Sequence, residues 1–198
     1  MRKLALLSVL SVLFVPALAD AQVNFGLRLG YALAMGEAGE GDDLSDGIKG
    51  QIPVQLDLGF KVTPALTLGG YFGYGFGRLG DEFEDCDDCS ARVYRLGAQL
   101  EYTFGAPWLG AGIGYEWASI SNDAVDAKMS FRGFEYLNVQ GGMDWNVGDK
   151  VWVGPFAMIT FGQYSTVSTE NIGVPGGDIE DKGFHEWVQI GIRGRFSL

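Results

Sequence analysis

The chain has 198 residues, a length typical of one domain, and it is rich in glycine (31 residues) and in aromatic residues (13%). Its formal net charge of −11 argues against nucleic-acid binding, which requires a basic surface. No segment keeps a 3.6-residue hydrophobic period, so we expect strands rather than amphipathic helices.

The N-terminal segment has the pattern of an export signal. Basic residues come first, an apolar run follows over 4–15, and Ala19-Asp20-Ala21 has the small-residue pattern of a signal-peptidase site. A membrane anchor is the alternative, but the run is shorter than the roughly 20 residues that span a bilayer as a helix. We therefore expect a cleaved signal peptide over 1–21 and a single domain over 22–198.

Apolar and polar residues alternate in the remainder of the chain. A period of two predicts strands whose two faces meet different environments. The expected strands cover residues 22–34, 51–62, 66–78, 92–104, 108–120, 132–145, 151–164 and 188–198. The seventh strand is the least regular, because Trp152, Phe156 and Met158 share its otherwise polar face.

Short and long connections alternate between these strands. Short turns are expected at 63–65, 105–107 and 146–149, and longer polar segments at 35–50, 81–90, 121–130 and 165–182. This arrangement is typical of a sheet that crosses a membrane. We predict an all-β fold, an eight-stranded antiparallel up-and-down transmembrane β-barrel. A secreted, lipocalin-like barrel is the alternative, but it would need apolar residues on the inward face.

The export signal, the eight alternating strands and the closing strand together resemble the small bacterial outer-membrane barrels of the OmpA/OmpX type. The segment Gly154-Pro-Phe-Ala-Met-Ile-Thr-Phe-Gly-Gln-Tyr164 is similar to uncharacterised proteins of this class. The resemblance covers the mature chain. It implies a monomer in the outer membrane of a Gram-negative bacterium, with periplasmic termini and external loops. It also implies contact with lipid and lipopolysaccharide, and with the barrel-assembly machinery during biogenesis.

Charged residues of both signs fall on the inward face of the expected strands. Side chains just fill the interior of an eight-stranded barrel, and unpaired charges there are costly. We therefore predict an ion-paired plug, with a narrow pore as the alternative. The expected members are Arg28, Asp57, Lys61, Arg95, Glu101, Glu116, Asp144, Arg193 and Arg195. Inward glycines on the third and fifth strands leave room for Tyr71 and other large side chains.

The two cysteines, Cys86 and Cys89, lie in an acidic segment. Acidic neighbours disfavour a redox thiolate, and zinc would require two further ligands. We expect a local disulfide. The surrounding carboxylates read as a solvated loop, with calcium binding as the sharper alternative. The candidate calcium ligands are Asp81, Glu82, Glu84, Asp85, Asp87 and Asp88.

The single histidine, His185, is followed by Glu186, and Ser165 lies at the other end of the last polar segment. Some eight-stranded barrels are lipid A acyl-processing enzymes that use such residues at the outer rim. Adjacent strand residues point to opposite faces, however, so His185 and Glu186 form a poor catalytic pair. We expect a rim histidine without a catalytic role.

These expectations favour a non-enzymatic barrel with a plugged lumen, acidic external loops and a structural or surface-interaction role, without a cofactor. A narrow pore or a transporter of small hydrophobic solutes is the alternative, suggested by Trp152, Phe156 and Tyr164 on the inner face. A lipid A-modifying surface enzyme is a third possibility.

Overall fold

The computed structural model describes residues 22–39, 41–83, 85–173 and 175–198. The expected signal peptide over 1–21 lies outside the described residues. Within the described part of the chain, no helix is long and apolar enough to cross a membrane.

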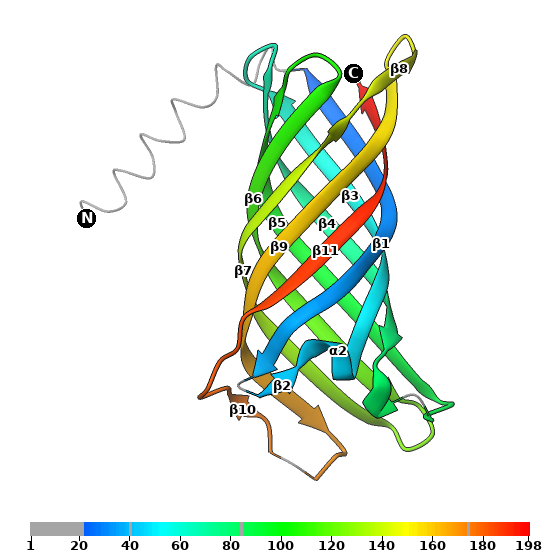
Figure 1. Ribbon diagram of the computed structural model, residues 1–198, viewed down its shortest axis with the longest axis vertical. Coiled ribbons are helices and arrows are strands. Elements are labelled where there is room, and N and C mark those ends of the chain that lie inside the picture. Colours follow the sequence, from blue (N-terminus) through cyan, green and yellow to red (C-terminus); the bar gives the residue numbers. More distant parts are fainter. Residues whose placement is uncertain (1–21, 40, 84, 174) are drawn as a thin grey trace, which may run out of the picture.

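The described residues form a closed antiparallel barrel of eight long strands (Figure 1). This confirms the predicted fold class. The barrel strands are β1 (Val23–Gly39), β3 (Ile48–Lys61), β4 (Leu66–Leu79), β5 (Cys89–Thr103), β6 (Pro107–Asn122), β7 (Ala127–Met143), β9 (Val151–Glu170) and β11 (His185–Ser197).

Each barrel strand pairs with its two neighbours along the chain, and β1 pairs with β11 to close the cylinder. Asn24 lies opposite Ser197, and Gly36 lies opposite His185, so the closing seam runs almost the whole length of both strands. We call the end with the short connections and the C-terminus the turn end, and the other the loop end.

Several strands are longer than the alternation predicts. The expected loop over 121–130 is too long, because β6 continues to Asn122 and β7 begins at Ala127, which leaves a turn over 123–126. The expected loop over 165–182 is partly wrong as well, because β9 continues to Glu170. In the extensions of β6 and β9 both faces carry polar residues, so the hydrophobic alternation disappears although the backbone ladder continues. The extension of β7 keeps the alternation, with Ala127, Met129 and Phe131 on one face and Lys128 and Ser130 on the other.

Short elements decorate the two ends of the barrel. The expected loop over 35–50 contains the end of β1, the two-residue strand β2 (Asp42–Asp43) and the helix α2 (Leu44–Gly47), whose Leu44 is buried. At the loop end lie also the 3-10 helix η1 (Asp81–Phe83) and β10 (Gly177–Asp178). At the turn end, β8 (Trp145–Gly148) pairs with the start of β9.

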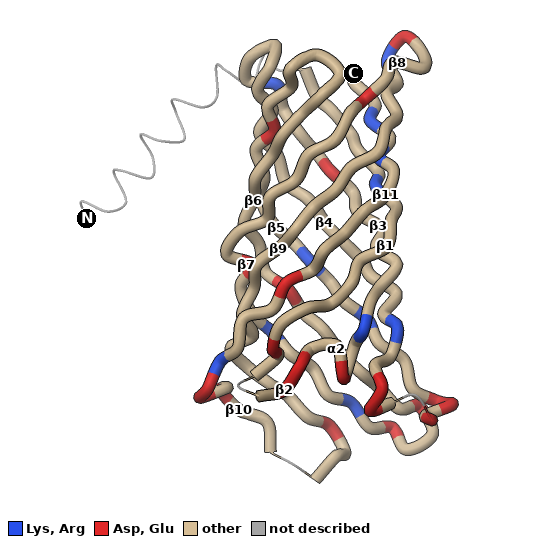
Figure 2. Tube along the Cα trace, in the orientation of Figure 1, with Lys and Arg blue, Asp and Glu red and all other residues tan. Residues whose placement is uncertain are grey.

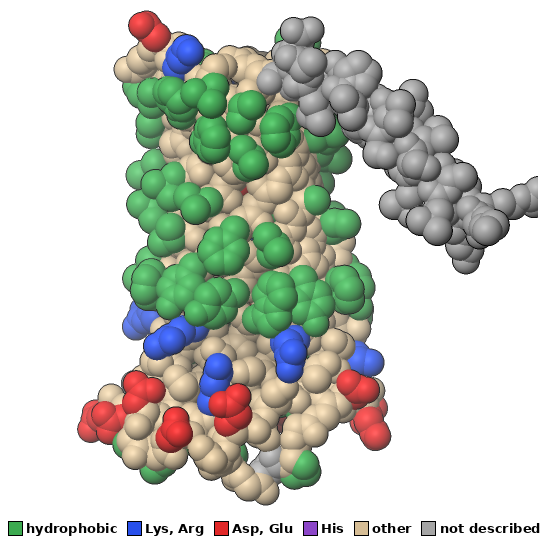
Figure 3. Space-filling view, turned by 180° about the vertical axis from the view of Figure 1, so that it is seen from behind, with side chains coloured by type: hydrophobic (Ala, Val, Ile, Leu, Met, Phe, Trp, Pro, Cys, Tyr) green, Lys and Arg blue, Asp and Glu red, His purple; other side chains and the backbone are tan. Residues whose placement is uncertain are grey.

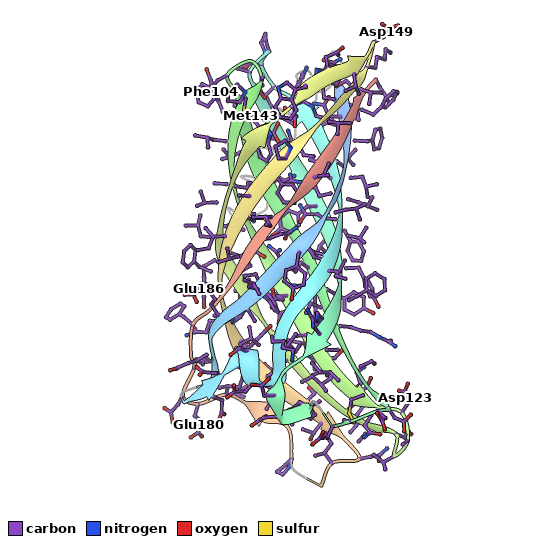
Figure 4. The ribbon with its side chains drawn as sticks, turned by 45° about the vertical axis from the view of Figure 1, so that its right-hand side comes forward. Phe104, Asp123, Met143, Asp149, Glu180 and Glu186 are labelled. Atoms are coloured by element: carbon purple, nitrogen blue, oxygen red, sulfur yellow. A yellow bond between two sulfur atoms is a disulfide. The ribbon has the colours of Figure 1, made fainter. Side chains whose placement is uncertain are left out.

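The outside of the barrel is apolar and the inside is filled with side chains (Figures 3 and 4). Leu27, Ile113 and Ile190 are 45%, 60% and 64% exposed, and each belongs to the outward set of its strand. Figure 3 shows hydrophobic side chains covering the wall, with charged side chains gathered beyond them at the loop end. A wall of this kind is suited to a lipid environment.

Glycine on the inner wall makes room for Tyr71, which is 3% exposed. A Cβ built on Gly114 would overlap the Tyr71 hydroxyl and lie 2.9 Å from the carbonyl oxygen of Leu96. Gly97 approaches the same ring. The two glycines therefore form the surface against which Tyr71 packs.

We expect Gly114→Ala to lower the free energy of unfolding by about 1–3 kcal/mol, because the added methyl group overpacks the site. The measurement is urea unfolding from lipid vesicles, followed by tryptophan fluorescence. Gly194→Ala is the matched control, since nothing lies within 4 Å of the Cβ built there. Equal stability of the two variants would contradict this account of Tyr71.

Candidate functional site in the barrel lumen

Two arginines of β11 meet two carboxylates near the turn end, and we call these residues the turn-end quartet: Arg193, Arg195, Glu101 and Asp144. The guanidinium group of Arg193 donates to Glu101, and its Nη2 lies 2.5 Å from Asp144 Oδ2. Arg195 Nη1 lies 3.4 Å from Glu101 Oε1, and its Nε lies 3.6 Å from Asp144 Oδ2. Each carboxylate is thus shared between two cations.

Arg28 and Asp57 form the next ion pair, with Arg28 Nε 2.6 Å from Asp57 Oδ2. Asp57 Oδ1 also accepts hydrogen bonds from Gln55 and Gln99, at 2.9 and 3.0 Å. Arg28 donates to the side-chain oxygen of Gln140 as well. The pair is therefore hydrogen-bonded on several sides, as a buried charge requires.

Trp108 separates these two groups of charges. Its ring centroid lies 3.6 Å from the guanidinium carbon of Arg193 and 5.4 Å from that of Arg28. Phe156 lies at 5.4 Å from Arg28, and Trp152 at 5.1 Å from Arg195. The aromatic residues on the inner face of β9 and β6 thus pack against arginines rather than lining an open channel.

Arg95 forms a third group with Glu135 and Tyr71. Arg95 Nε and Nη2 lie 2.7 and 2.5 Å from Glu135 Oε2. The other oxygen, Glu135 Oε1, accepts from the Tyr71 hydroxyl at 2.8 Å and from Asn138 Nδ2 at 2.6 Å. Glu135 is 2% exposed and is thus one of the best-satisfied carboxylates of the lumen.

Glu135 does not follow from the alternation, which places it outside. The register with β9 shifts between Glu135 and Leu137, and the register with β6 shifts between Glu135 and Asn138, so β7 has an extra residue at Tyr136. Both Tyr136 and Leu137 face outward, at 53% and 41% exposure, whereas Glu135 turns inward. A β-bulge reverses the faces of a strand without an apolar signal in the sequence.

Glu116 organises a fourth group toward the loop end. Its Oε1 accepts from the Tyr164 hydroxyl and from Trp187 Nε1, the latter at 3.1 Å. His185 Nε2 lies 3.4 Å from the same oxygen, and the His185 ring stacks on Tyr164 with centroids 4.1 Å apart. Arg95 Nε lies 3.8 Å from Glu116 Oε2 and links this group to the previous one.

Apolar side chains fill the lumen between Glu116 and the loop end, and we call this cluster the loop-end plug. Most of its members are small inward residues of the barrel strands, and Leu44 of α2 joins them from the loop end. Tyr164 and Trp187 also belong to this buried cluster and lie on the side of Glu116. The plug consists of Ala32, Ala34, Leu44, Ile48, Ala91, Val93, Ala118 and Ile120.

Little space remains beside the ion pairs. A cavity of about 30 Å³ borders the turn-end quartet and Arg28. This volume accommodates about two water molecules. The ion pairs therefore leave only a small cavity at this level of the barrel.

Lys61 does not join the ion pairs, contrary to the sequence-based expectation. Its Nζ donates to the side-chain oxygen of Gln22 at 2.9 Å. Among the described residues, no carboxylate lies within 4.0 Å of this ammonium group. Lys61 is the last residue of β3, where the lumen opens at the turn end.

The two cysteines and the acidic residues around them lie in a loop outside the lumen clusters. Cys86 and Cys89 form a disulfide. In the described part of the chain, no group of three or more His, Cys, Asp or Glu residues is placed to hold a metal ion. Asp81, Glu82, Asp85, Asp87 and Asp88 are exposed, and Glu84 lies outside the described residues.

The expected rim position of His185 is wrong, because this residue is 2% exposed inside the lumen. Glu186 lies on the opposite face of β11 and is half-buried. Ser165 donates to the carbonyl oxygen of Arg132 at 3.3 Å. The structure gives His185 its hydrogen-bonding contact with Glu116 and not with Ser165.

We expect Arg193→Met to lower the free energy of unfolding by about 3–5 kcal/mol, because it leaves two buried carboxylates without their shortest partner. Lys61→Met is the matched control, with an expected change of about 0.5 kcal/mol or less. Urea unfolding from vesicles measures both. A loss in Arg193→Met no larger than in the control would show that the quartet contributes no stability.

Comparisons with known proteins place this barrel in a family. A family model described as an outer membrane protein beta-barrel domain matches residues 5–186. A comparison with curated protein sequences finds no match.

Among solved structures, the chain resembles the Neisserial surface protein A (NspA), with 16% identity over 85% of this chain and 95% of that one and a TM-score of 0.51. Ail, the attachment invasion locus protein of Yersinia pestis, was solved with the heparin analogue sucrose octasulfate. It has 14% identity over 89% and 99% of the two chains, with a TM-score of 0.51. The outer membrane protein AlkL has 10% identity over 90% and 91%, with a TM-score of 0.53. These similarities show the shared fold, and the family match shows that the chain belongs to the outer membrane protein β-barrel family.

Proposed function

We propose that this outer-membrane barrel is sealed and non-enzymatic, and that it acts through its extracellular end rather than as a channel. The observation that carries the proposal is the filling of the lumen at successive levels. Ion pairs occupy the lumen from the turn end to its middle, and the loop-end plug occupies the part nearest the loop end. A conducting pore would need a continuous wet path through all of them.

The loop end, which this proposal places outside the cell, has the negative charge of a surface that attracts basic partners. Figure 2 shows acidic residues concentrated there, beyond the barrel wall. The exposed carboxylates among the described residues of this end are Asp42, Asp43, Asp46, Asp81, Glu82, Asp85, Asp87, Asp88, Asp123, Asp126, Glu170, Asp178, Glu180 and Asp181. Like charges repel, so we do not carry over to this end the sulfated ligand seen with Ail.

The role of His185 supports a non-enzymatic assignment. A histidine that works as a general base must reach both its substrate and a nucleophile. Here the imidazole stacks on Tyr164 and faces Glu116, below the loop-end plug. A lipid substrate in the outer leaflet would have to displace these contacts.

We expect the mature protein to show no discrete conductance steps after insertion into planar bilayers. Single substitutions such as Glu101→Ala should also stay silent, because the levels above remain filled. Insertion is verified by the heat-dependent migration of the folded barrel in gel electrophoresis. An open porin provides the positive control for conductance. Discrete steps from the wild-type protein would overturn the sealed reading and make the lumen charges selectivity determinants.

One observation favours a second function, the transfer of small hydrophobic solutes. A cavity of about 400 Å³ opens at the extracellular end, and part of its lining is apolar. The apolar lining residues include Leu44, Ile48, Ile120, Met129 and Phe131. A small aromatic molecule could lodge there, although the loop-end plug lies directly below.

Methionine methyl groups distinguish binding from passage. Met129 lines the cavity, Met158 is buried near the turn end, and Met143 faces outward as a reporter of partition into lipid. With indole as the probe, we expect the NMR signal of the Met158 methyl group to stay fixed. A specific shift of Met158, without an equal shift of Met143, would favour the transporter.

A further inference from the structure

Three cations gather on the outer wall of the barrel, at the border between the apolar band and the extracellular loops. They are Lys49 of β3, Arg78 of β4 and Arg92 of β5. The pairing of β3 with β4 shifts between Ile48 and Gly50, and this irregularity leaves Lys49 unpaired in the ladder, with its side chain 37% exposed. Figure 3 shows basic side chains in a row between the apolar wall and the acidic residues.

These cations line one hollow of about 550 Å³, which we call the basic hollow. Tyr74, Phe76 and Leu79 form much of its floor. Among the described residues, none of those that line it is acidic. This is unusual in a chain with a formal charge of −11, since neighbouring surface hollows contain carboxylates.

The cations of the basic hollow are poorly neutralised within the protein. Lys49 Nζ lies 3.7 Å from Asp81, whose side chain is 83% exposed. Arg78 donates to the Tyr31 hydroxyl at 3.3 Å. Over the described residues, no carboxylate lies within 4.0 Å of the Arg78 or Arg92 guanidinium group. Neither arginine is therefore ion-paired among the described residues, and Arg92 also borders the neighbouring hollow that contains Asp123, Asp126 and Glu170.

The floor of the hollow is aromatic and continuous with the apolar wall. Tyr74 contacts Phe76 edge-on at 4.7 Å between centroids, and Tyr94 at 5.0 Å. Arg92 lies opposite Phe76 in the pairing of β4 with β5, so cation and ring share one level of the barrel. A ligand that fits both features has an apolar body in the membrane and an anionic head at its surface.

We propose that the basic hollow binds a phosphorylated lipid of the outer leaflet, with the head-group chemistry of lipopolysaccharide. Phosphate groups match the planar donors of Arg78 and Arg92, and acyl chains match the apolar wall below. The position also agrees with the membrane sidedness, because the three cations lie on the extracellular side of the apolar band. This inference goes beyond the proposed function and does not depend on whether the lumen is sealed.

The test is titration of the folded protein, in a neutral detergent, with lipid A that carries both phosphates, with native mass spectrometry as the readout. Dephosphorylated lipid A with the same acyl chains is the second ligand. We expect tighter binding of the phosphorylated form. Arg78→Gln/Arg92→Gln should lose about 25-fold in affinity for it, at roughly fivefold per cation near an anionic lipid surface.

The matched control is Lys150→Gln/Lys182→Gln, which removes two exposed cations from other parts of the surface and should leave the affinity unchanged. Heat-dependent migration verifies folding, and the single variant Arg92→Gln, with an expected loss of about fivefold, serves if the double variant fails to fold. The proposal is overturned if the wild-type protein binds both forms of lipid A equally. It is also overturned if the arginine variant binds as tightly as the lysine control.

Discussion

The cost of holding ionised groups inside a narrow cylinder is the constraint on which this structure depends. Inward residues of an eight-stranded barrel have neither bulk water nor lipid around them, and an isolated charge there is strongly unfavourable. The chain meets this constraint by sharing each carboxylate. Glu101 and Asp144 each serve two arginines, and Glu135 satisfies Arg95 and Tyr71 together. Amide side chains such as Gln99 and Gln140 complete the contacts between the charged groups.

The two ends of the lumen are filled by different kinds of side chain. At the turn end, the Ser197 hydroxyl donates to Asn24 Oδ1 across the seam between β11 and β1. At the loop end, apolar side chains and the helix α2 replace the ion pairs. A small cavity lies beside the polar contacts of the turn end, and a larger cavity borders the loop-end plug. The outer wall is equally asymmetric, since the three cations of the basic hollow border the apolar band at the loop end.

The alternation of apolar and polar residues predicted the fold because the two faces of each strand meet different surroundings, lipid outside and the polar lumen inside. It places Arg28, Arg95 and Arg193 inside correctly, and it shows that Trp152 and Phe156 share their face. It cannot show partners, since the residues that meet across the lumen are far apart in the chain. It also fails where the strand departs from a period of two. Glu135 was missed for this reason, because the bulge at Tyr136 reverses the faces of β7.

Other features could not be predicted from the sequence, because their residues occur in more than one environment. The loop-end plug uses Ala91, Val93 and Ala118, whose small apolar side chains are as common on an outer wall as inside. The extensions of β6 and β9 beyond the apolar band are polar on both faces, so they resemble loops in sequence. His185 was expected at the rim because the strand was expected to begin at Val188, three residues later than it does.

The lumen clusters also shape how the chain reaches its folded state. Arg193 and Glu101 are 92 residues apart, Arg28 and Gln140 are 112 apart, and Ser197 and Asn24 are 173 apart. None of these contacts can form within one hairpin, and contacts between distant residues make folding slow. A partly assembled sheet would therefore expose solitary arginines to the bilayer interior. Insertion and closure must occur as one cooperative event, in which the seam between β1 and β11 and the charge clusters form together.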